Sequence, residues 1–265
     1  MLASGCMSRR VSRRKEPSRE KHAIKEQLKI EEGVLDTRSM GYLSKFFNKG
    51  IVSKLEFKIA SGKEADVYVA DSGHGVPGGA PFVILKFFRV ETSLFLNMQD
   101  YILGDPRFHG LGKSKTEVVR VWCMKEFGNL RVASEHGVSV PRPLMAHGSI
   151  LAMEFIGDEY GTAAPTLNRV RLEEPDMMLD GIMRSVRLLY RAQLVHADLS
   201  EYNVLVSNGR HYLIDLGQAV SVKHPRASEF LGRDVRNMLD YFRKEYGCER
   251  DLADALSFVT AELGF

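Results

Sequence analysis

The sequence has few cysteines, no long apolar run and no apolar segment near its N-terminus. Its three cysteines, Cys6, Cys123 and Cys248, lie far apart among 265 residues, which excludes a disulfide framework and a cysteine-based metal site. The longest apolar stretch, 81–88, is interrupted by Lys86 and falls well short of the roughly 18 residues that a membrane helix needs. No apolar core follows the first arginines, so a secretory signal is also excluded. These absences predict a cytoplasmic protein that does not contact membranes.

The rest of the composition is that of a globular protein with one unusual end. Hydrophobic residues make up 44% and charged residues 27% of the chain, which excludes disorder throughout. The net charge of +3 conceals an asymmetry, because residues 1–30 hold nine Lys or Arg and only three Glu. We expect 1–30 to form a basic, mobile tail, which either stays solvated or contacts the phosphate backbone of a nucleic acid.

The pattern of apolar residues predicts a strand-rich half followed by a helical half. After short helical pieces at 34–49, strands are expected at 55–60, 67–70, 82–88, 144–147 and 150–156, with one helix at 113–134. From about Asp176 the pattern is helical, with further helices expected at 228–244 and 250–262 and extended pieces at 194–196 and 211–214. We therefore expect an α+β fold with an N-lobe over 31–155, a C-lobe over 156–265 and a ligand-binding cleft between them.

The strongest chemical signal is a pair of short motifs in the second half. The sequence HADLSEYN occupies 196–203, and IDLG occupies 214–217. Transfer of a phosphoryl group from ATP needs a carboxylate beside the incoming hydroxyl and oxygen ligands for magnesium. Asp198 and Asn203 lie on one predicted loop, and Asp215 ends an apolar strand, where a carboxylate needs a metal or cationic partner. A helix cap or a turn would explain each residue alone, whereas the three together favour magnesium-dependent phosphoryl transfer.

Lys86 is the second chemical feature, because it interrupts a strand that is expected to be buried. A buried lysine is costly unless it is paired. The following helix offers Glu126, on an apolar stripe with Trp122 and Leu130. A pair of Lys86 with Glu126 would satisfy both charges and direct the ammonium group toward phosphates. The alternative is a solvent-facing lysine on an edge strand.

The placement of Glu126 on the buried face of this helix has a competitor. Cys123 and Phe127 define a second apolar face. With either face buried, we expect Lys125 to be exposed to solvent.

A short turn with the sequence SGKEA lies at 61–65, between two predicted strands. It lacks the Gly-x-Gly-x-x-Gly pattern of kinase phosphate loops, and it lacks a Walker A motif because Glu64 rather than Ser or Thr follows Lys63. Its position before Val67 is where a lid over phosphates would lie. Taken alone, an ordinary hairpin turn is favoured.

Together these segments resemble the RIO family of atypical protein kinases, type-1 subfamily, in its compact archaeal-like form. The resemblance rests on SGKEA at 61–65, Lys86, KEFGNL at 125–130, HADLSEYN at 196–203 and IDLG at 214–217. FRVETS at 88–93 and GDPRF at 104–108 are similar to the type-1 subfamily in particular. The resemblance covers about residues 35–245. It implies a two-lobed protein-kinase-like fold with a strand-rich N-lobe and a truncated helical C-lobe, which binds ATP and Mg2+, with Mn2+ as a substitute.

The resemblance also implies roles for single residues. Asp198 would be the catalytic base, Asn203 and Asp215 would hold the metal ion, and Lys86 would contact the phosphates. The other residues expected at the nucleotide are Ser61, Lys63, Glu126, Met153, Glu154 and Ile156, with the backbone of the last two against adenine. Family members are also associated with a phosphorylated aspartate at the position of Asp215 and with a flexible loop matched by 89–113. Their association with maturation of the small ribosomal subunit would fit the basic tail as a contact with the subunit precursor or its RNA.

The predicted activity is ATP-dependent serine phosphorylation, including self-phosphorylation, together with ATP hydrolysis. After Asp215 the chain departs from ordinary protein kinases: little sequence remains and no Ala-Pro-Glu motif occurs, so an activation segment and the usual peptide-docking groove are not expected. A small-molecule kinase of the aminoglycoside or choline type shares the His-x-Asp-x-x-x-x-Asn pattern but usually has a larger helical lobe. An assembly factor that binds pre-ribosomal RNA and uses ATP as a switch shares every one of these residues and is the other alternative.

Overall fold

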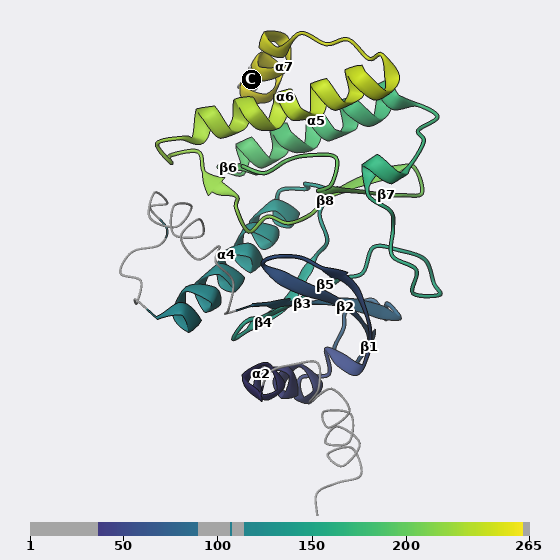
Figure 1. Cartoon of the computed structure of the whole chain (residues 1–265), viewed down its shortest axis with the longest axis vertical. Coiled ribbons are helices and arrows are strands. Elements are labelled where there is room, and N and C mark those ends of the chain that lie inside the picture. Colours follow the sequence, from purple (N-terminus) through teal and green to yellow (C-terminus); the bar gives the residue numbers. More distant parts are fainter. Residues whose placement is uncertain (1–36, 90–106, 108–113, 262–265) are drawn as a thin grey trace, which may run out of the picture.

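A five-stranded antiparallel sheet dominates the first half of the chain (Figure 1). The computed structural model describes residues 37–89, 107 and 114–261, so the predicted tail at 1–30 and most of the predicted loop at 89–113 lie outside the described residues. The strands run in the order β1 (Val52–Ser61), β2 (Ala65–Ser72), β3 (Phe82–Phe88), β5 (Ile150–Glu154) and β4 (Pro143–His147). β3 is therefore the central strand, paired with β2 on one side and β5 on the other.

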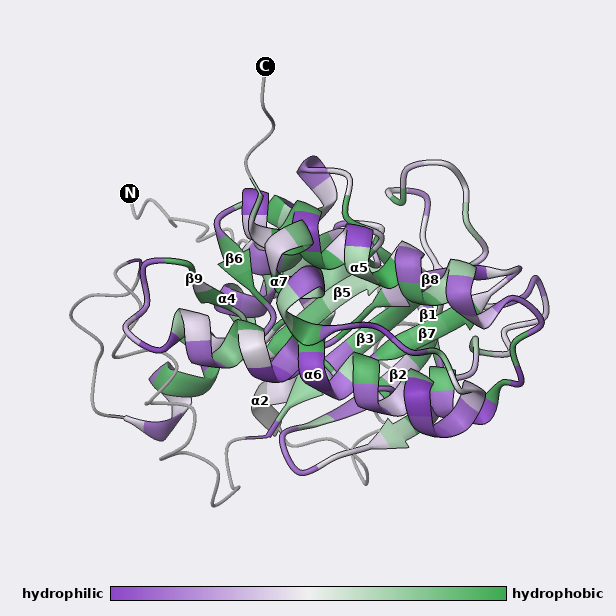
Figure 2. Cartoon of the chain, turned by 90° about the horizontal axis from the view of Figure 1, so that it is seen from above, coloured by the Kyte–Doolittle hydropathy of each residue, from purple (hydrophilic) through white to green (hydrophobic). Residues whose placement is uncertain are grey.

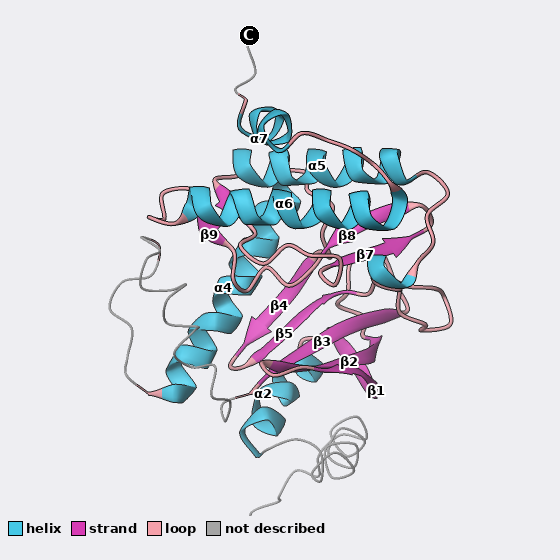
Figure 3. Cartoon of the chain, turned by 45° about the horizontal axis from the view of Figure 1, so that its top comes forward, coloured by secondary structure: helices cyan, strands magenta, loops and turns pink. Residues whose placement is uncertain are grey.

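Helices cover both faces of the sheet. α2 (Thr37–Asn48) lies on the face away from the helical lobe, and α4 (Lys115–Glu135) lies on the side of that lobe (Figures 1 and 3). The helical lobe contains α5 (Pro175–Arg191), α6 (Ala227–Tyr246), α7 (Leu252–Thr260) and a 3-10 turn at Leu167–Arg169. It also contains two short ladders, β6 (Leu194–Val195) with β9 (Val220–Ser221) and β7 (Val204–Ser207) with β8 (Arg210–Leu213).

The two faces of β3 enter two different hydrophobic clusters. Val83 and Leu85 belong to the cluster that includes α2, whereas Ile84 and Phe88 belong to the cluster that includes α4. Successive side chains of a strand point to opposite faces. Lys86 has the parity of Ile84 and Phe88, so its side chain projects toward α4.

The cluster on the α4 side continues into the helical lobe. It joins Ile84 of β3 and Trp122 of α4 to Ile182 of α5 and Phe242 of α6. Figure 2 shows the corresponding pattern, with strands that are mostly hydrophobic and an α6 that alternates between hydrophobic and hydrophilic residues. This shared core fixes the loops of the helical lobe relative to β3 and α4.

Most of the predicted elements are present, and the differences are local. β3 has the predicted bounds, and one continuous α2 replaces the short helical pieces expected at 34–49. The apolar pattern does not predict β7, β9 or the 3-10 turn, because elements of four, two and three residues carry too little periodicity. α7 ends at Thr260, two residues earlier than expected. No helix among the described residues is long and apolar enough to cross a membrane.

Candidate active site

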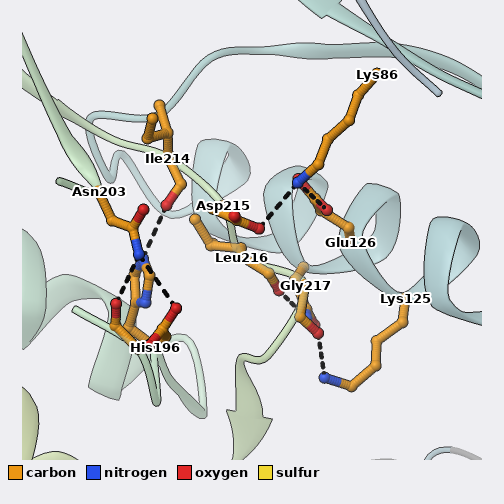
Figure 4. Close-up of polar contacts among 11 residues, drawn as sticks. Lys86, Lys125, Glu126, His196, Asn203, Ile214, Asp215, Leu216 and Gly217 are labelled. Carbon is orange, nitrogen blue, oxygen red and sulfur yellow. Dashed lines mark hydrogen bonds and ion pairs between the residues drawn. The ribbon is translucent and has the colours of Figure 1, made fainter. Parts of the chain in front are cut away.

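Lys86 is buried and bonded to two carboxylates from distant parts of the chain. Its Nζ donates to both carboxylate oxygens of Glu126, at 2.9 and 2.8 Å, and to Oδ1 of Asp215 at 2.9 Å (Figure 4). Only 8% of Lys86 and 1% of Glu126 are exposed. The predicted pair therefore forms. The alternative of a lysine on an edge strand is wrong, because β3 lies in the middle of the sheet.

The charges of this cluster shift one another's pKa values. Burial alone would lower the pKa of Lys86, but Asp215 and Glu126 outweigh it and raise the pKa well above its usual value. Burial tends to raise the pKa of Asp215, but Lys86 prevails and lowers it. Burial, with a further contribution from Asp215, raises the pKa of Glu126 to about 7, although Lys86 opposes this shift. One cation shared by two carboxylates leaves an excess of negative charge, which a cation bound beside Asp215 would offset.

The face of α4 that carries Glu126 is buried, as the apolar stripe predicts. The helix begins after Ser114, whose Oγ accepts a hydrogen bond from the backbone N–H of Glu117 at 3.3 Å. Trp122, Glu126 and Leu130 are each 1% exposed. Glu126 thus stands on a rigid element within reach of β3.

The expectation that Lys125 is exposed is wrong. Only 1% of this residue is exposed, and its Nζ donates to the backbone carbonyls of Gly217, at 2.7 Å, and Ala219, at 2.6 Å. α4 lies between the sheet and the segment that follows Asp215, so Cys123 of the competing face is buried as well, and Phe127 is partly buried. A helix enclosed in this way buries a wide arc instead of a single stripe.

The HADLSEYN segment forms a loop that α6 anchors. Asp234 accepts hydrogen bonds from the backbone N–H groups of Ala197, at 2.7 Å, and Leu199, at 3.0 Å. Arg233 donates to the carbonyl oxygen of Ala197. Ala197 has a φ of 65°, a left-handed conformation that costs a residue with a side chain about 1–2 kcal/mol. The two residues of α6 therefore stabilise a strained backbone on either side of Asp198.

Sequence analysis misses Asp234, although a signal for it exists. Asp234 lies three positions after Leu231 and four before Met238, and both of these are buried. A carboxylate on such an apolar stripe needs hydrogen-bond donors. Burial raises the pKa of Asp234 to about 7, while the two backbone N–H groups oppose this shift.

Asp198 and Asn203 contact each other, and the backbone ties them to Asp215. Nδ2 of Asn203 donates to the carbonyl oxygen of Asp198 at 2.8 Å and to its Oδ2 at 3.3 Å. The N–H of Ile214 donates to the carbonyl of Asn203 at 3.0 Å, and Nε2 of His196 lies 3.0 Å from the carbonyl oxygen of Ile214 (Figure 4). Burial and then the charge of Asp215 raise the pKa of Asp198. The structure therefore brings the three predicted residues together.

The turn after β1 is clamped by a residue at the end of β3. The guanidinium of Arg89 donates to the two carboxylate oxygens of Asp66, at 2.9 and 2.6 Å, and to Oγ of Ser61 at 2.8 Å. The backbone N–H of Arg89 donates to the carbonyl of Glu64 at 2.8 Å. Ser61 and Lys63 are exposed on this turn. Their contact with a nucleotide stays a prediction.

Glu64 is a carboxylate that sequence analysis does not assign to the site. Burial raises its pKa, Asp215 raises it further, and Lys86 and the indole of Trp122 oppose these shifts. The side chain of Glu64 therefore lies within electrostatic reach of the charged cluster. The only sequence signal is its position in the turn, where a Walker A motif would have a hydroxyl.

The connection after β5 is held by backbone hydrogen bonds. The N–H of Glu154 donates to the carbonyl of Arg142 at 2.8 Å, and the carbonyl of Ile156 accepts from the N–H of Ala164 at 2.9 Å. Met153, at 8% exposed, belongs to the core. These bonds fix 153–156 beside the end of β5, and the contact of this segment with adenine stays a prediction.

The donor atoms around Asp215 suit a magnesium ion whose coordination is completed by phosphates. Within the described ranges, no three His, Cys, Asp or Glu side chains gather as a self-sufficient metal site. Asp215 offers a carboxylate of lowered pKa, and Asn203 offers its amide oxygen because its Nδ2 is bonded to Asp198. Mg2+ is usually held by one or two carboxylates together with substrate phosphates. The residues present therefore fit such an ion.

Comparison with known proteins assigns this arrangement to a family. The model of the RIO domain matches residues 66–255, which include Lys86, Glu126, Asp198 and Asp215. The chain belongs to the RIO family. The RIO-type serine/threonine-protein kinase Rio1 of Haloferax volcanii is 38% identical over 259 residues, which cover 96% of this chain and 87% of the relative. Its namesake in Thermoplasma acidophilum is 40% identical over 175 residues, 65% of this chain and 90% of the relative. Within the RIO family, the chain is thus a RIO1-type atypical serine/threonine-protein kinase.

The eukaryotic RIO1 relatives are longer than this chain. The human serine/threonine-protein kinase RIO1 is 34% identical, and the match covers 86% of this chain but only 40% of the human protein. Among solved structures, the Rio2 kinase of Chaetomium thermophilum, in an ADP/Mg2+-phosphoaspartate complex, has a TM-score of 0.62 at 19% identity, over 85% of this chain and 67% of that chain. At that identity the likeness shows the fold alone. The fold is the predicted two-lobed, α+β, protein-kinase-like one.

Proposed function

We propose that this RIO-family chain is an ATP-dependent serine kinase that phosphorylates itself, hydrolyses ATP and takes part in maturation of the small ribosomal subunit. The observation that carries the phosphoryl-transfer part is the convergence of Lys86, Asp198, Asn203 and Asp215 from separate elements. Family membership supports the same reading and speaks against the aminoglycoside- or choline-type alternative.

Each of the four groups has a chemical role in this proposal. Lys86, kept charged by its carboxylate partners, binds the phosphates of ATP. Asp215 and Asn203 hold Mg2+, which when bound offsets the charge of the triphosphate. Asp198 accepts the proton of the attacking serine hydroxyl, and its raised pKa makes it a stronger base than an exposed carboxylate.

The substitution Asp198→Ala tests this assignment. Loss of a positioned base lowers rates by about 10²–10⁴-fold, so the variant should lose nearly all phosphoryl transfer from labelled ATP. Its affinity for ATP, measured by direct titration, should stay close to that of the parent. Asp240→Ala, at an exposed position of α6, is the matched control. Turnover of the Asp198 variant at the parental rate would contradict the proposal.

Asp215 is a second candidate acceptor of the phosphoryl group. The Rio2 structure is described as a phosphoaspartate complex, and Lys86 keeps the Asp215 carboxylate ionised. In this reaction a carboxylate oxygen attacks the γ-phosphorus, the bond to ADP breaks, and water later hydrolyses the acyl phosphate. Hydroxylamine cleaves an acyl phosphate but not a phosphoserine. Label that survives hydroxylamine therefore indicates a hydroxyl acceptor such as serine, and label that is released indicates a carboxylate acceptor, as expected for Asp215.

The proposed partner is the small-subunit precursor or its RNA, bound through residues 1–30. The nine basic residues of this segment support an interaction with phosphates. Affinity for precursor RNA should fall steeply with salt, and removal of 1–30 should weaken it. If ATP serves as a switch, the affinity should also change with nucleotide. Binding that is indifferent to both salt and nucleotide would contradict this part of the proposal.

A further inference from the structure

Lys125 and Asn129 lie one turn apart on α4 and face the backbone that follows Asp215. Lys125 donates to the carbonyls of Gly217 and Ala219, at 2.7 and 2.6 Å. Nδ2 of Asn129 donates to the carbonyl of Leu216 at 2.8 Å and to that of Ala219 at 3.1 Å. Asn129 is 0% exposed and Lys125 is 1% exposed. Both residues are thus buried to serve backbone carbonyls within 216–219.

The orientation of the Asn129 amide is fixed from its other end. Its Oδ1 accepts a hydrogen bond from Nη1 of Arg107 at 2.8 Å. An amide whose oxygen is held by a guanidinium must turn its nitrogen, and so its donors, the opposite way. The donors of Asn129 therefore point at the segment 216–219.

The peptide between Leu216 and Gly217 connects the Asn129 contact to the Asp215 carboxylate. The carbonyl of Leu216 accepts from Asn129. The N–H of the same peptide, which belongs to Gly217, helps to lower the pKa of the Asp215 carboxylate. Because the peptide is rigid and planar, holding its oxygen aims its N–H. Asp215 itself has a φ of 61°, a conformation that a residue with a side chain keeps only when its surroundings impose it.

The segment 216–219 also packs closely against α4 at Gly217. A Cβ added at Gly217 would lie 3.1 Å from Nε1 of Trp122 and 3.2 Å from Oε2 of Glu126. The glycine lets the backbone come within hydrogen-bond reach of the Lys125 ammonium. A charged donor forms stronger hydrogen bonds to carbonyls than a neutral one does, provided that the geometry is kept.

We propose that Lys125 and Asn129 are positioning residues that latch the backbone at 216–219 to α4 and thereby hold the Asp215 carboxylate beside Lys86. The proposal rests on the proposed function only where it concerns Mg2+. The α4 helix then carries two separate devices. Glu126 fixes the cation of β3, and the latch fixes the carboxylate to which that cation is bonded.

The first test measures the latch without nucleotide or metal. Lys125→Met removes the charged donor and keeps most of the volume, and Lys115→Met, at an exposed position of the same helix, is the control. Hydrogen exchange of the full chain, followed by mass spectrometry, should show amides of 216–220 exchanging at least about tenfold faster in Lys125→Met. Peptides from β2 and β3 should exchange as in the parent, and Lys115→Met should match the parent throughout.

The second test measures Mg2+ binding through a fluorescent ATP analogue. In Lys125→Met the affinity for the analogue without Mg2+ should be parental, whereas the Mg2+ concentration for half-maximal effect should rise about tenfold or more. A residue with a merely structural role would not separate these two quantities. Parental exchange at 216–220 together with a parental Mg2+ requirement would overturn the latch.

If Lys125→Met is not folded, as judged by a lack of cooperative unfolding, a second variant tests the latch. Asn129→Ala removes the neutral donors to 216–219, together with the Oδ1 acceptor of Arg107, so we expect the same pattern at about a few-fold in each measurement. Parental values in this variant would then overturn the proposal. Hydrogen exchange involves no phosphoryl transfer, so a parent without kinase activity would refute the proposed function and leave the latch result standing.

Discussion

Two lysines are buried where α4 packs against its neighbours, Lys86 of β3 and Lys125 of α4, and they are stabilised by different kinds of partner. Lys86 is bonded to two carboxylates, Glu126 and Asp215, whereas Lys125 is bonded to the backbone carbonyls of Gly217 and Ala219. A buried charge is costly unless it is paired or well hydrogen-bonded, and both solutions meet that demand. The carboxylates can be protonated and the carbonyls cannot. The β3 side of the site should therefore respond to pH, and the side facing 216–219 should depend mainly on geometry.

The largest effect should come from Lys86→Met, which leaves Glu126 and Asp215 without their cation. Breaking a buried ion pair costs about 3–5 kcal/mol in free energy of unfolding. Losing a preorganised electrostatic contact should also lower kcat by about 10²-fold or more. Urea unfolding and transfer from labelled ATP measure the two losses.

A second substitution separates the two lysines. Adding Glu126→Gln to Lys86→Met should restore part of the stability, because it removes one unpaired carboxylate. The same addition to Lys125→Met should restore nothing. If Glu126→Gln restored the same stability in both backgrounds, the contrast between carboxylate and carbonyl partners would be wrong.

The next effect is a pH dependence that the partners of Lys86 should contribute and those of Lys125 should not. The pKa of Glu126 is raised in the folded state to about 7, above an unfolded value of about 4.3. Its contribution to stability is complete below about pH 4.3 and is lost as the pH rises through 7, with a slope of at most about 1.4 kcal/mol per pH unit. The Glu126 contribution therefore lowers the urea midpoint between pH 5 and 7, whereas His196 and His211, whose folded pKa values burial lowers to about 4, raise it up to about pH 6.5.

Variants identify the groups behind this pH dependence. Glu126→Gln should remove the part of the curve that falls with pH because of Glu126, and Lys125→Met should run parallel to the parent. A remaining slope of the same sign in Glu126→Gln is expected from Asp234, whose folded pKa is also raised to about 7, and from Asp198 and Glu64, whose pKa values are raised as well. An unchanged curve in Glu126→Gln would place the titrating group elsewhere.

A smaller effect is expected at Arg89, a cation that is exposed instead of buried. Its side chain is 40% exposed, and exposed ion pairs contribute about 0–1 kcal/mol. Arg89→Met should therefore change the urea midpoint little. Because it frees Ser61 and the turn at 61–65, it should raise KM for ATP by about a few-fold. A stability loss as large as that of Lys86→Met would contradict the contrast between buried and exposed cations.

The smallest effect should come from Ala197→Gly, in the loop that α6 anchors. Glycine adopts the φ of 65° without strain, but it also gains freedom in the unfolded chain. We expect a stabilisation of less than about 1 kcal/mol, seen as a small rise in Tm. The effects of Ala197→Gly and Lys125→Met should add if the two sites are independent. A destabilised Ala197→Gly would show that the alanine side chain itself packs against the loop.

The predictions made from the sequence succeed where both partners of an interaction are side chains that can be recognised in the sequence. Lys86 and Glu126 are two charges on apolar elements, so each needs a partner and the pair can be inferred. The bounds of β3 follow from an apolar run, interrupted only by Lys86, that a central strand can bury. Asp198, Asn203 and Asp215 come together as the motif spacing predicts.

The failures share one cause. Lys125 is expected in solvent because it lies on neither candidate apolar face of its helix, and the sequence analysis assigns no role to Asp234. Their partners are backbone groups, which every residue has and which leave no mark in the sequence. β7 and β9 are similar, since such short strands exist only because their partners are brought to them.

The sequence by itself determined the chemistry of this protein: which carboxylates, amide and cation are available, and which of them lie on apolar segments that must pair them. The tertiary structure alone decided which backbone carbonyls meet Lys125, because Gly217 and Ala219 lie 92 and 94 positions away along the chain. A charged side chain can be recognised in the sequence at any position, whereas the position of a backbone carbonyl depends on the whole path of the chain. That path follows from the shared core of the two lobes, which packs 216–219 against α4.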